Sequence, residues 1–136
     1  MRTLLSVLLA TVSCSPLFSQ EKKPESATDK LVEKCFEILK NAESISPLDK
    51  PTKADAVAAL GLLGEERAVP VLVEHLEKEK TDSLRFNIIR ALGWIKSAKA
   101  VPALEKVLKN DRSRLCRKVA AMVLSDITGK DYKDDK

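Results

Sequence analysis

Apolar residues recur along most of the chain at the three- and four-residue spacing of amphipathic helices. This pattern predicts helices with the approximate bounds 30–40, 52–63, 68–79, 83–95, 98–109 and 113–127. Pro70 and Pro102 fall in the first turn of two of them, where the missing N–H has no intrahelical acceptor to lose. We expect the first, fourth and sixth helices to be capped by Thr28 or Asp29, Thr81 or Asp82, and Asn110 or Asp111.

Two stretches of this pattern are copies of each other. Residues 59–76 read ALGLLGEERAVPVLVEHL, and residues 91–108, at an offset of 32, read ALGWIKSAKAVPALEKVL. Each copy contains the end of one helix, a short polar corner and the start of the next helix. Gly61 and Gly93 fall late in the first helix, where a missing side chain allows a neighbouring helix to approach closely, or the helix to fray. A repeat of this period predicts a solenoid in which stacked units bury a shared core.

The segment from Leu84 to Leu108, LRFNIIRALGWIKSAKAVPALEKVL, resembles a HEAT repeat of the short bacterial kind that is also found in phycobilisome-lyase-like proteins. In that family the pattern V-R-x-x-A-A-x-A-L-G-x-I-G precedes a corner and the sequence A-V-P-x-L. Its positions are occupied here by Leu84, Arg85, Ile88, Ile89, Ala91, Leu92, Gly93 and Ile95. The preceding copy fits over residues 56–72, and the last copy fits only the first half of the pattern. The resemblance covers roughly residues 52–128 and implies an all-α fold, an α-solenoid of about three antiparallel helical hairpins.

The first 20 residues have the composition of a secretory signal. Arg2 supplies a short basic region, residues 4–12 are apolar, and small serines follow as cleavage points. This apolar stretch is far shorter than the about 20 residues that span a bilayer, and no other stretch is long or apolar enough, so we expect no membrane span. We therefore expect an exported protein, periplasmic or extracellular. The alternative is a bacterial lipoprotein acylated at Cys14, although the leucine usual three positions upstream is absent.

The rest of the chain divides into a flexible polar leader at 21–29, a HEAT-like repeat domain at 30–128 and a charged tail at 129–136. Without residues 1–20 there remain 116 residues, in which 23 Lys and Arg against 20 Asp and Glu leave a net charge of +3. This balance gives no independent reason to expect nucleic acid or anionic lipid as a partner.

A basic stretch near the C-terminus could bind an acidic partner, but Glu105 and Asp111 dilute it and we expect a solvated face. It comprises Lys106, Lys109, Arg112, Arg114, Arg117 and Lys118.

His75 is the only histidine, and it is flanked by Glu74 and Glu77. HEAT-like hydroxylases that bind iron use several His–Glu pairs on successive repeats, and this chain has none. A single imidazole without converging ligands cannot build a typical transition-metal or zinc site. We therefore expect a solvated surface histidine, with no catalytic residue, metal or cofactor in the chain.

The two cysteines outside the signal, Cys35 and Cys116, belong to the first and the last predicted helix. That placement separates them by roughly two helix layers of about 8–10 Å each. A disulfide needs Cα atoms within about 7 Å. We expect both thiols to be free, buried and unreactive.

Arg85 and Arg117 occupy the arginine position of the family pattern, and Lys53 is their counterpart in the first hairpin. We expect these side chains to bridge carboxylates or helix ends between adjacent hairpins. Contact with a ligand is the alternative.

The fourth helix carries the surface feature most suggestive of binding. Once its core positions face inward, Phe86, Arg90 and Trp94 follow one another at i, i+4 and i+8 on another stripe. Leu62 and Met122 occupy the flanking helices at the positions equivalent to Trp94 and Arg90. Aromatic and arginine side chains of this kind are typical of interface hot spots, which predicts a partner-binding surface. The alternative is that Phe86 and Trp94 merely cover neighbouring helices.

HEAT-like repeats are mostly binding scaffolds, and some relatives are enzymes. The resemblance and the predicted signal together favour a small exported HEAT-repeat protein that acts as a protein-binding scaffold or adaptor through its concave face. The alternative is a HEAT-type enzyme or enzyme accessory, bilin-lyase-like or hydroxylase-like. The short array and the lack of His–Glu pairs disfavour that alternative.

Overall fold

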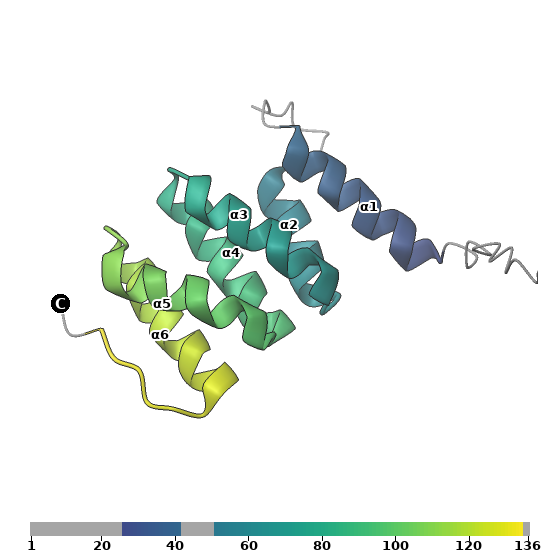
Figure 1. Cartoon of the computed structure of the whole chain (residues 1–136). Coiled ribbons are helices and arrows are strands. Elements are labelled where there is room, and N and C mark those ends of the chain that lie inside the picture. The colour runs from purple at the N-terminus through teal and green to yellow at the C-terminus, as the bar shows by residue number, and fades with distance from the viewer. Residues whose placement is uncertain (1–25, 42–50, 135–136) are drawn as a thin grey trace, which may run out of the picture.

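The structure, a computed structural model, describes residues 26–41 and 51–134, and over these residues it is helical without strands (Figure 1). The α-helices are α1 (Ala27–Lys40), α2 (Lys53–Leu62), α3 (Val69–Lys78), α4 (Asp82–Ile95), α5 (Val101–Asn110) and α6 (Arg114–Thr128). Two short 3₁₀ helices, η1 (Glu66–Ala68) and η2 (Ala98–Ala100), form the corners before α3 and α5. The predicted helices are all present. The predicted signal with Cys14, and most of the predicted leader, lie outside the described residues.

Consecutive helices pair into hairpins, and the hairpins stack. α1 packs on α2, α3 on α4, and α5 on α6, while α4 also packs against both α2 and α6 (Figure 1). The helices α2, α4 and α6 therefore form one layer, and α3 and α5 lie in the other layer beside it. This confirms the predicted α-solenoid of three helical hairpins.

One continuous hydrophobic core runs between the layers and reaches all the helices. Its largest fully buried side chains include Leu39 of α1, Leu60 of α2, Leu72 of α3, Leu92 of α4, Leu104 of α5 and Leu124 of α6. Because each hairpin contributes apolar side chains to a cluster shared with its neighbours, no hairpin buries its own apolar face alone.

The close packing of α2, α4 and α6 depends on the two repeat glycines. A Cβ atom built on Gly61 would lie 2.8 Å from the Cα of Ala91 in α4. A Cβ atom built on Gly93 would lie 2.7 Å from Cγ2 of Val123 in α6. Neither spacing is possible for a real side chain without displacement, so the glycines permit the close approach of α2 to α4 and of α4 to α6.

The helix caps differ from prediction at α1 and α6, whereas the N-cap position of α4 is Thr81, as predicted. Ser26 caps α1, and it forms a reciprocal capping box with Asp29 three residues later, so α1 begins inside the predicted leader. Ser113 caps α6 by accepting a hydrogen bond from the backbone N–H of Cys116. Thr81 does precede α4, but its side chain makes no capping hydrogen bond.

The described part of the charged tail, residues 129–134, folds back along the stack (Figure 1). After Gly129, whose φ of +72° ends α6, the segment runs back beside α6 (Figure 1). The Tyr132 ring packs against the core cluster, and its hydroxyl donates to Oε1 of Glu105 in α5 at 3.0 Å. The Tyr132 N–H donates to Oγ of Ser125 at 3.1 Å.

Candidate protein-binding surface

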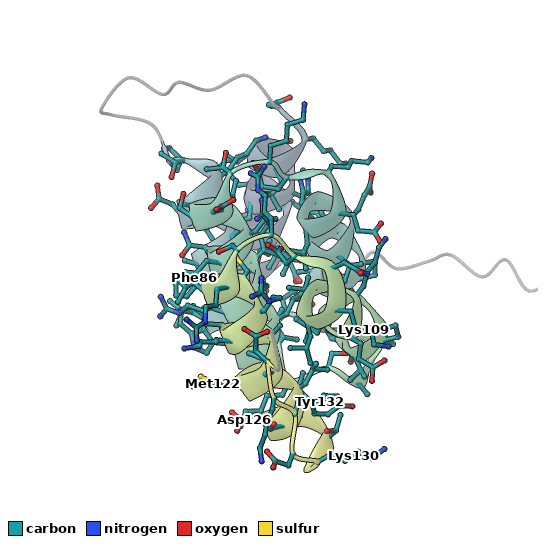
Figure 2. The ribbon with its side chains drawn as sticks, turned by 90° about the vertical axis from the view of Figure 1, so that its left-hand side faces the viewer. Phe86, Lys109, Met122, Asp126, Lys130 and Tyr132 are labelled. Atoms are coloured by element: carbon teal, nitrogen blue, oxygen red, sulfur yellow. The ribbon has the colours of Figure 1, made fainter. Side chains whose placement is uncertain are left out.

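The predicted binding residues lie on the layer formed by α2, α4 and α6. Leu62 and Met122 are 74% and 70% exposed, which is high for large apolar side chains. Trp94 is 42% exposed, Arg90 is exposed, and Phe86 is half-buried. Figure 2 shows Phe86, Met122 and Asp126 following one another along one side of the stack. The sequence pattern thus identified a set of apolar side chains that reach solvent on this layer.

Arg90 joins the two aromatic residues of α4. Its guanidinium carbon lies 4.9 Å from the ring centroid of Trp94 and 5.6 Å from that of Phe86. Both distances are within the range of cation–π attraction, which restrains the arginine against the rings. Arg90 is exposed, and among the described residues it makes no hydrogen bond and no ion pair.

Trp94 also packs against the preceding hairpin. A Cβ atom on Gly61 would lie 2.8 Å from Cε3 of Trp94, so the benzo edge of the indole covers the backbone of α2 at this glycine. The two interpretations of Trp94 therefore both hold in part. One edge of the ring covers a neighbouring helix, and the rest of the ring is accessible.

A groove of about 340 Å³ runs between α4 and α6 beside these residues. Phe86, Arg90, Trp94 and Met122 all line it, whereas Leu62 lies outside it on α2. The groove is further lined by Gly93, Lys96, Val119, Val123 and Asp126. The structure therefore brings four of the five predicted residues to one groove, with Leu62 as an exposed apolar neighbour.

Lys96 was not among the predicted binding residues, although the sequence already shows that it departs from the repeat pattern. The family pattern has glycine at this position, and the equivalent residue of the preceding repeat is Gly64, with φ of +64°. Lys96 itself adopts the left-handed conformation, with φ of +55°. A side chain in that conformation costs about 1 kcal/mol relative to glycine. The departure from the pattern places a cation at the end of α4, on the rim of the groove.

Arg85 and Arg117 have the structural role that was expected of them. Arg85 is buried, and it binds the carboxylate of Asp111 in addition to the backbone carbonyl of Lys80. Arg117 donates to the carbonyl of Asp111 and to the carboxylate of Asp134. The parallel does not extend to Lys53, which makes no hydrogen bond or ion pair with the described residues. A lysine lacks the planar fork that lets arginine bind a carboxylate and a carbonyl together.

The remaining residues of chemical interest do not converge on a site. Within the described parts of the chain, no three His, Cys, Asp or Glu side chains are placed to hold a metal ion. His75 is half-buried, not fully solvated, and burial, followed by the charge of Lys53, lowers its pKa below the ordinary value. Cys35 and Cys116 are free and buried as predicted, and burial raises the pKa of both thiols.

These features define a helical-hairpin solenoid with an exposed apolar and aromatic surface on one layer. The family model of HEAT repeats matches residues 37–125, which is more than half of the 136 residues. The chain therefore belongs to the HEAT-repeat family. No curated protein and no solved structure gave a significant match to the chain. Along residues 26–41 and 51–134, no helix combines the length and the apolar character needed to cross a membrane.

Proposed function

We propose that this protein is an exported scaffold or adaptor that binds another protein, or a peptide segment, through the surface formed by Leu62, Phe86, Arg90, Trp94 and Met122. HEAT repeats commonly mediate protein–protein interaction. We call these five residues the α4 surface, because three of them belong to that helix.

The observation that carries the proposal is the arginine that contacts one exposed and one half-buried aromatic ring, beside a mostly apolar groove. Interface energy concentrates in a few aromatic and arginine anchors that are surrounded by less important contacts. Such anchors work best when they are held in place before binding, because less side-chain entropy is then lost. Phe86, Arg90 and Trp94 meet both conditions.

Photo-crosslinking in the cell of origin tests the surface directly. A photoreactive amino acid at Met122, which is 70% exposed, should capture a discrete partner. The matched control is the same amino acid at Leu31, which is 45% exposed on α1, far from the groove. The captured partner, once identified and purified, should bind the native protein and should lose that binding to the Arg90→Glu variant. Capture at Leu31 alone, or binding that Arg90→Glu leaves unchanged, would contradict the proposal.

Export is part of the same proposal, and it is supported by the basic and apolar pattern of residues 1–20. Mass spectrometry of the mature N-terminus distinguishes the possible fates. A free N-terminus within or shortly after this segment supports soluble export. An acylated Cys14 at the new N-terminus would show the lipoprotein alternative, and an intact N-terminus in the cytoplasm would contradict export altogether.

The proposal assigns no catalytic residue and no cofactor. Its supporting observation is that the chain's only histidine stands alone, without the His–Glu pairs of the hydroxylase-like relatives. Purified protein that carries stoichiometric iron or a covalently bound bilin would overturn this part of the proposal.

A further inference from the structure

We propose that the α4 surface recognises an acidic segment: a peptide that places an Asp or Glu carboxylate on Arg90 and a neighbouring apolar side chain in the groove beside Met122. This inference rests on the proposed function and specifies the chemistry of the partner.

The first support is that Arg90 lacks the carboxylate that most other arginines have. Four arginines pair with carboxylates within the described residues, namely Arg67, Arg85, Arg112 and Arg117. Arg90 has only its two aromatic rings. A guanidinium that rests against rings still presents its N–H groups along its edge, and that fork matches a carboxylate with two parallel hydrogen bonds.

The second support is the charge around the groove. Arg90 and Lys96 line it, and Asp126 is the only acidic residue that does so. On α6, Arg114 and Lys118 precede Met122 at intervals of four residues, which places them on the same stripe of that helix. Neither Arg114 nor Lys118 forms a hydrogen bond or ion pair with the described residues. The excess of positive charge complements an acidic partner.

Three residues of the basic C-terminal stretch form ion pairs within the stack, and two others are exposed on α6. Lys106 pairs with Glu77, Arg112 with Asp82 and Arg117 with Asp134, and these contacts hold the stack together. Arg114 and Lys118 are exposed on α6, the helix that forms one wall of the groove. Arg114 and Lys118 therefore add positive charge to the same helix that carries Met122.

The apolar content of the surface favours a peptide over a nucleic acid. Leu62 and Met122 offer apolar contacts to the aliphatic side chains of a peptide, but no stacking plane for a base. Adjacent helices lie about 8–10 Å apart, so a segment that crosses α2, α4 and α6 spans about 16–20 Å. An extended peptide of about six residues covers that distance.

Intrinsic fluorescence gives a direct test, because Trp94 is the only tryptophan of the chain. Purified full-length protein is titrated with a short peptide that alternates Asp or Glu with Leu. The same peptide with Asn and Gln, a Lys–Leu peptide and a single-stranded thymidine oligonucleotide serve as comparisons. The acidic peptide should change the Trp94 emission and bind at least about tenfold more tightly than the amide peptide, because charge-assisted hydrogen bonds are roughly twice as strong as neutral ones. Its binding should weaken as salt screens the charges.

Two variants that remove the same charge complete the test. Arg90→Gln should weaken binding of the acidic peptide about tenfold or more and leave binding of the amide peptide unchanged. Arg67→Gln, at an exposed corner paired with Glu65 and Asp29, should change neither. Circular dichroism checks that both variants are folded.

The outcomes separate this inference from the proposed function. Equal binding of acidic and amide peptides, with no effect of Arg90→Gln, would overturn the acidic preference and leave a protein-binding surface. A preference for the Lys–Leu peptide or for the oligonucleotide would also overturn the inference. If no peptide binds and the crosslinker at Met122 captures no partner, the proposed function itself fails.

Discussion

The guanidinium of Arg85 forms a two-pronged pair with the carboxylate of Asp111, which lies 26 positions later in the corner between α5 and α6. Nε donates to Oδ2 and Nη2 donates to Oδ1, both at 2.9 Å, and the two side chains are only 8% and 7% exposed. One repeat later, Arg117 binds the carboxylate of Asp134, also at 2.9 Å. Asp134, in the segment after α6, therefore supplies to Arg117 the carboxylate that Asp111 supplies to Arg85, and this ion pair holds that segment against the stack.

Replacing Arg85 by Met should destabilise the fold strongly. The substitution leaves the Asp111 carboxylate buried without its cation, and removing one partner of a buried pair typically costs about 3–5 kcal/mol. It also removes a donor to the Lys80 carbonyl in the connection between α3 and α4. Urea unfolding measures the loss. The control is Arg112→Met, an exposed pair with Asp82 that should cost less than about 1 kcal/mol. Equal losses in the two variants would show that the Arg85 pair contributes no more than a surface contact.

Leu92 tests the packing of the middle hairpin. It is fully buried, so Leu92→Ala should leave a cavity and lower the free energy of unfolding by about 2–5 kcal/mol. The same substitution at Leu62, which is 74% exposed, should cost less than about 0.5 kcal/mol. A loss below 1 kcal/mol for Leu92→Ala would mean that the core assignment is wrong.

The pattern of apolar positions predicted the helices and their pairing well, because a 32-residue repeat leaves few alternatives for burying the shared face. The caps were predicted less well. Ser26 and Asp29 are separated by three residues, the spacing of a capping box, and that signal was available in the sequence. Asp111 was assigned to a cap, but it binds buried Arg85, and a contact 26 residues away has no local signal.

The α4 surface was predictable in composition but not in shape. The i, i+4 spacing on α4 placed Phe86, Arg90 and Trp94 together correctly. The groove against α6 depends on how closely the helices approach at Gly93, and the burial of one edge of Trp94 depends on Gly61. Helix separation of this kind is decided by packing between repeats, which the pattern within one helix does not contain.

Gly93 offers a sharper test of that packing. Helix propensity alone predicts that Gly93→Ala stabilises α4 by up to about 1 kcal/mol. We expect the opposite, a loss of about 1–3 kcal/mol, because the new Cβ would overlap Cγ2 of Val123. In a Val123→Ala background the nearest atom is the Val123 Cβ position, 3.6 Å away, an ordinary contact. The same Gly93→Ala change should then be neutral or stabilising. A double-mutant cycle without coupling would refute this account of the glycine.

The thiols should be unreactive and should make the protein sensitive to alkaline pH. Burial raises the pKa of Cys35 and Cys116 above the ordinary value of about 8.5. The folded state then holds the thiol protons more tightly than the unfolded state, so stability is complete below the ordinary pKa and falls as pH rises above it.

A thiol-reactive chromophore at pH of about 8 should react slowly with native protein and fully in urea. A Cys35→Ala, Cys116→Ala variant should show a smaller loss of stability between about pH 8 and 10. Fast labelling of the native protein would contradict the predicted burial.

The last prediction separates binding from folding on the α4 surface. Truncating an anchor of an interface typically costs about 2 kcal/mol or more, which is about a thirtyfold rise in Kd. Trp94→Ala should cause such a loss of partner binding. It should also reduce the free energy of unfolding by about 1–2 kcal/mol, because one edge of the indole packs against Gly61.

Met122→Ala gives the cleaner readout of the same surface. Its side chain is 70% exposed, so stability should stay within about 0.5 kcal/mol of the native protein while partner binding weakens. Leu31→Ala, at a 45% exposed position of α1, should change neither quantity. Isothermal titration with the purified partner identified by crosslinking measures binding, and urea unfolding measures stability. If Trp94→Ala only destabilises the protein and Met122→Ala binds normally, Trp94 is a packing residue and the binding surface lies elsewhere on the stack.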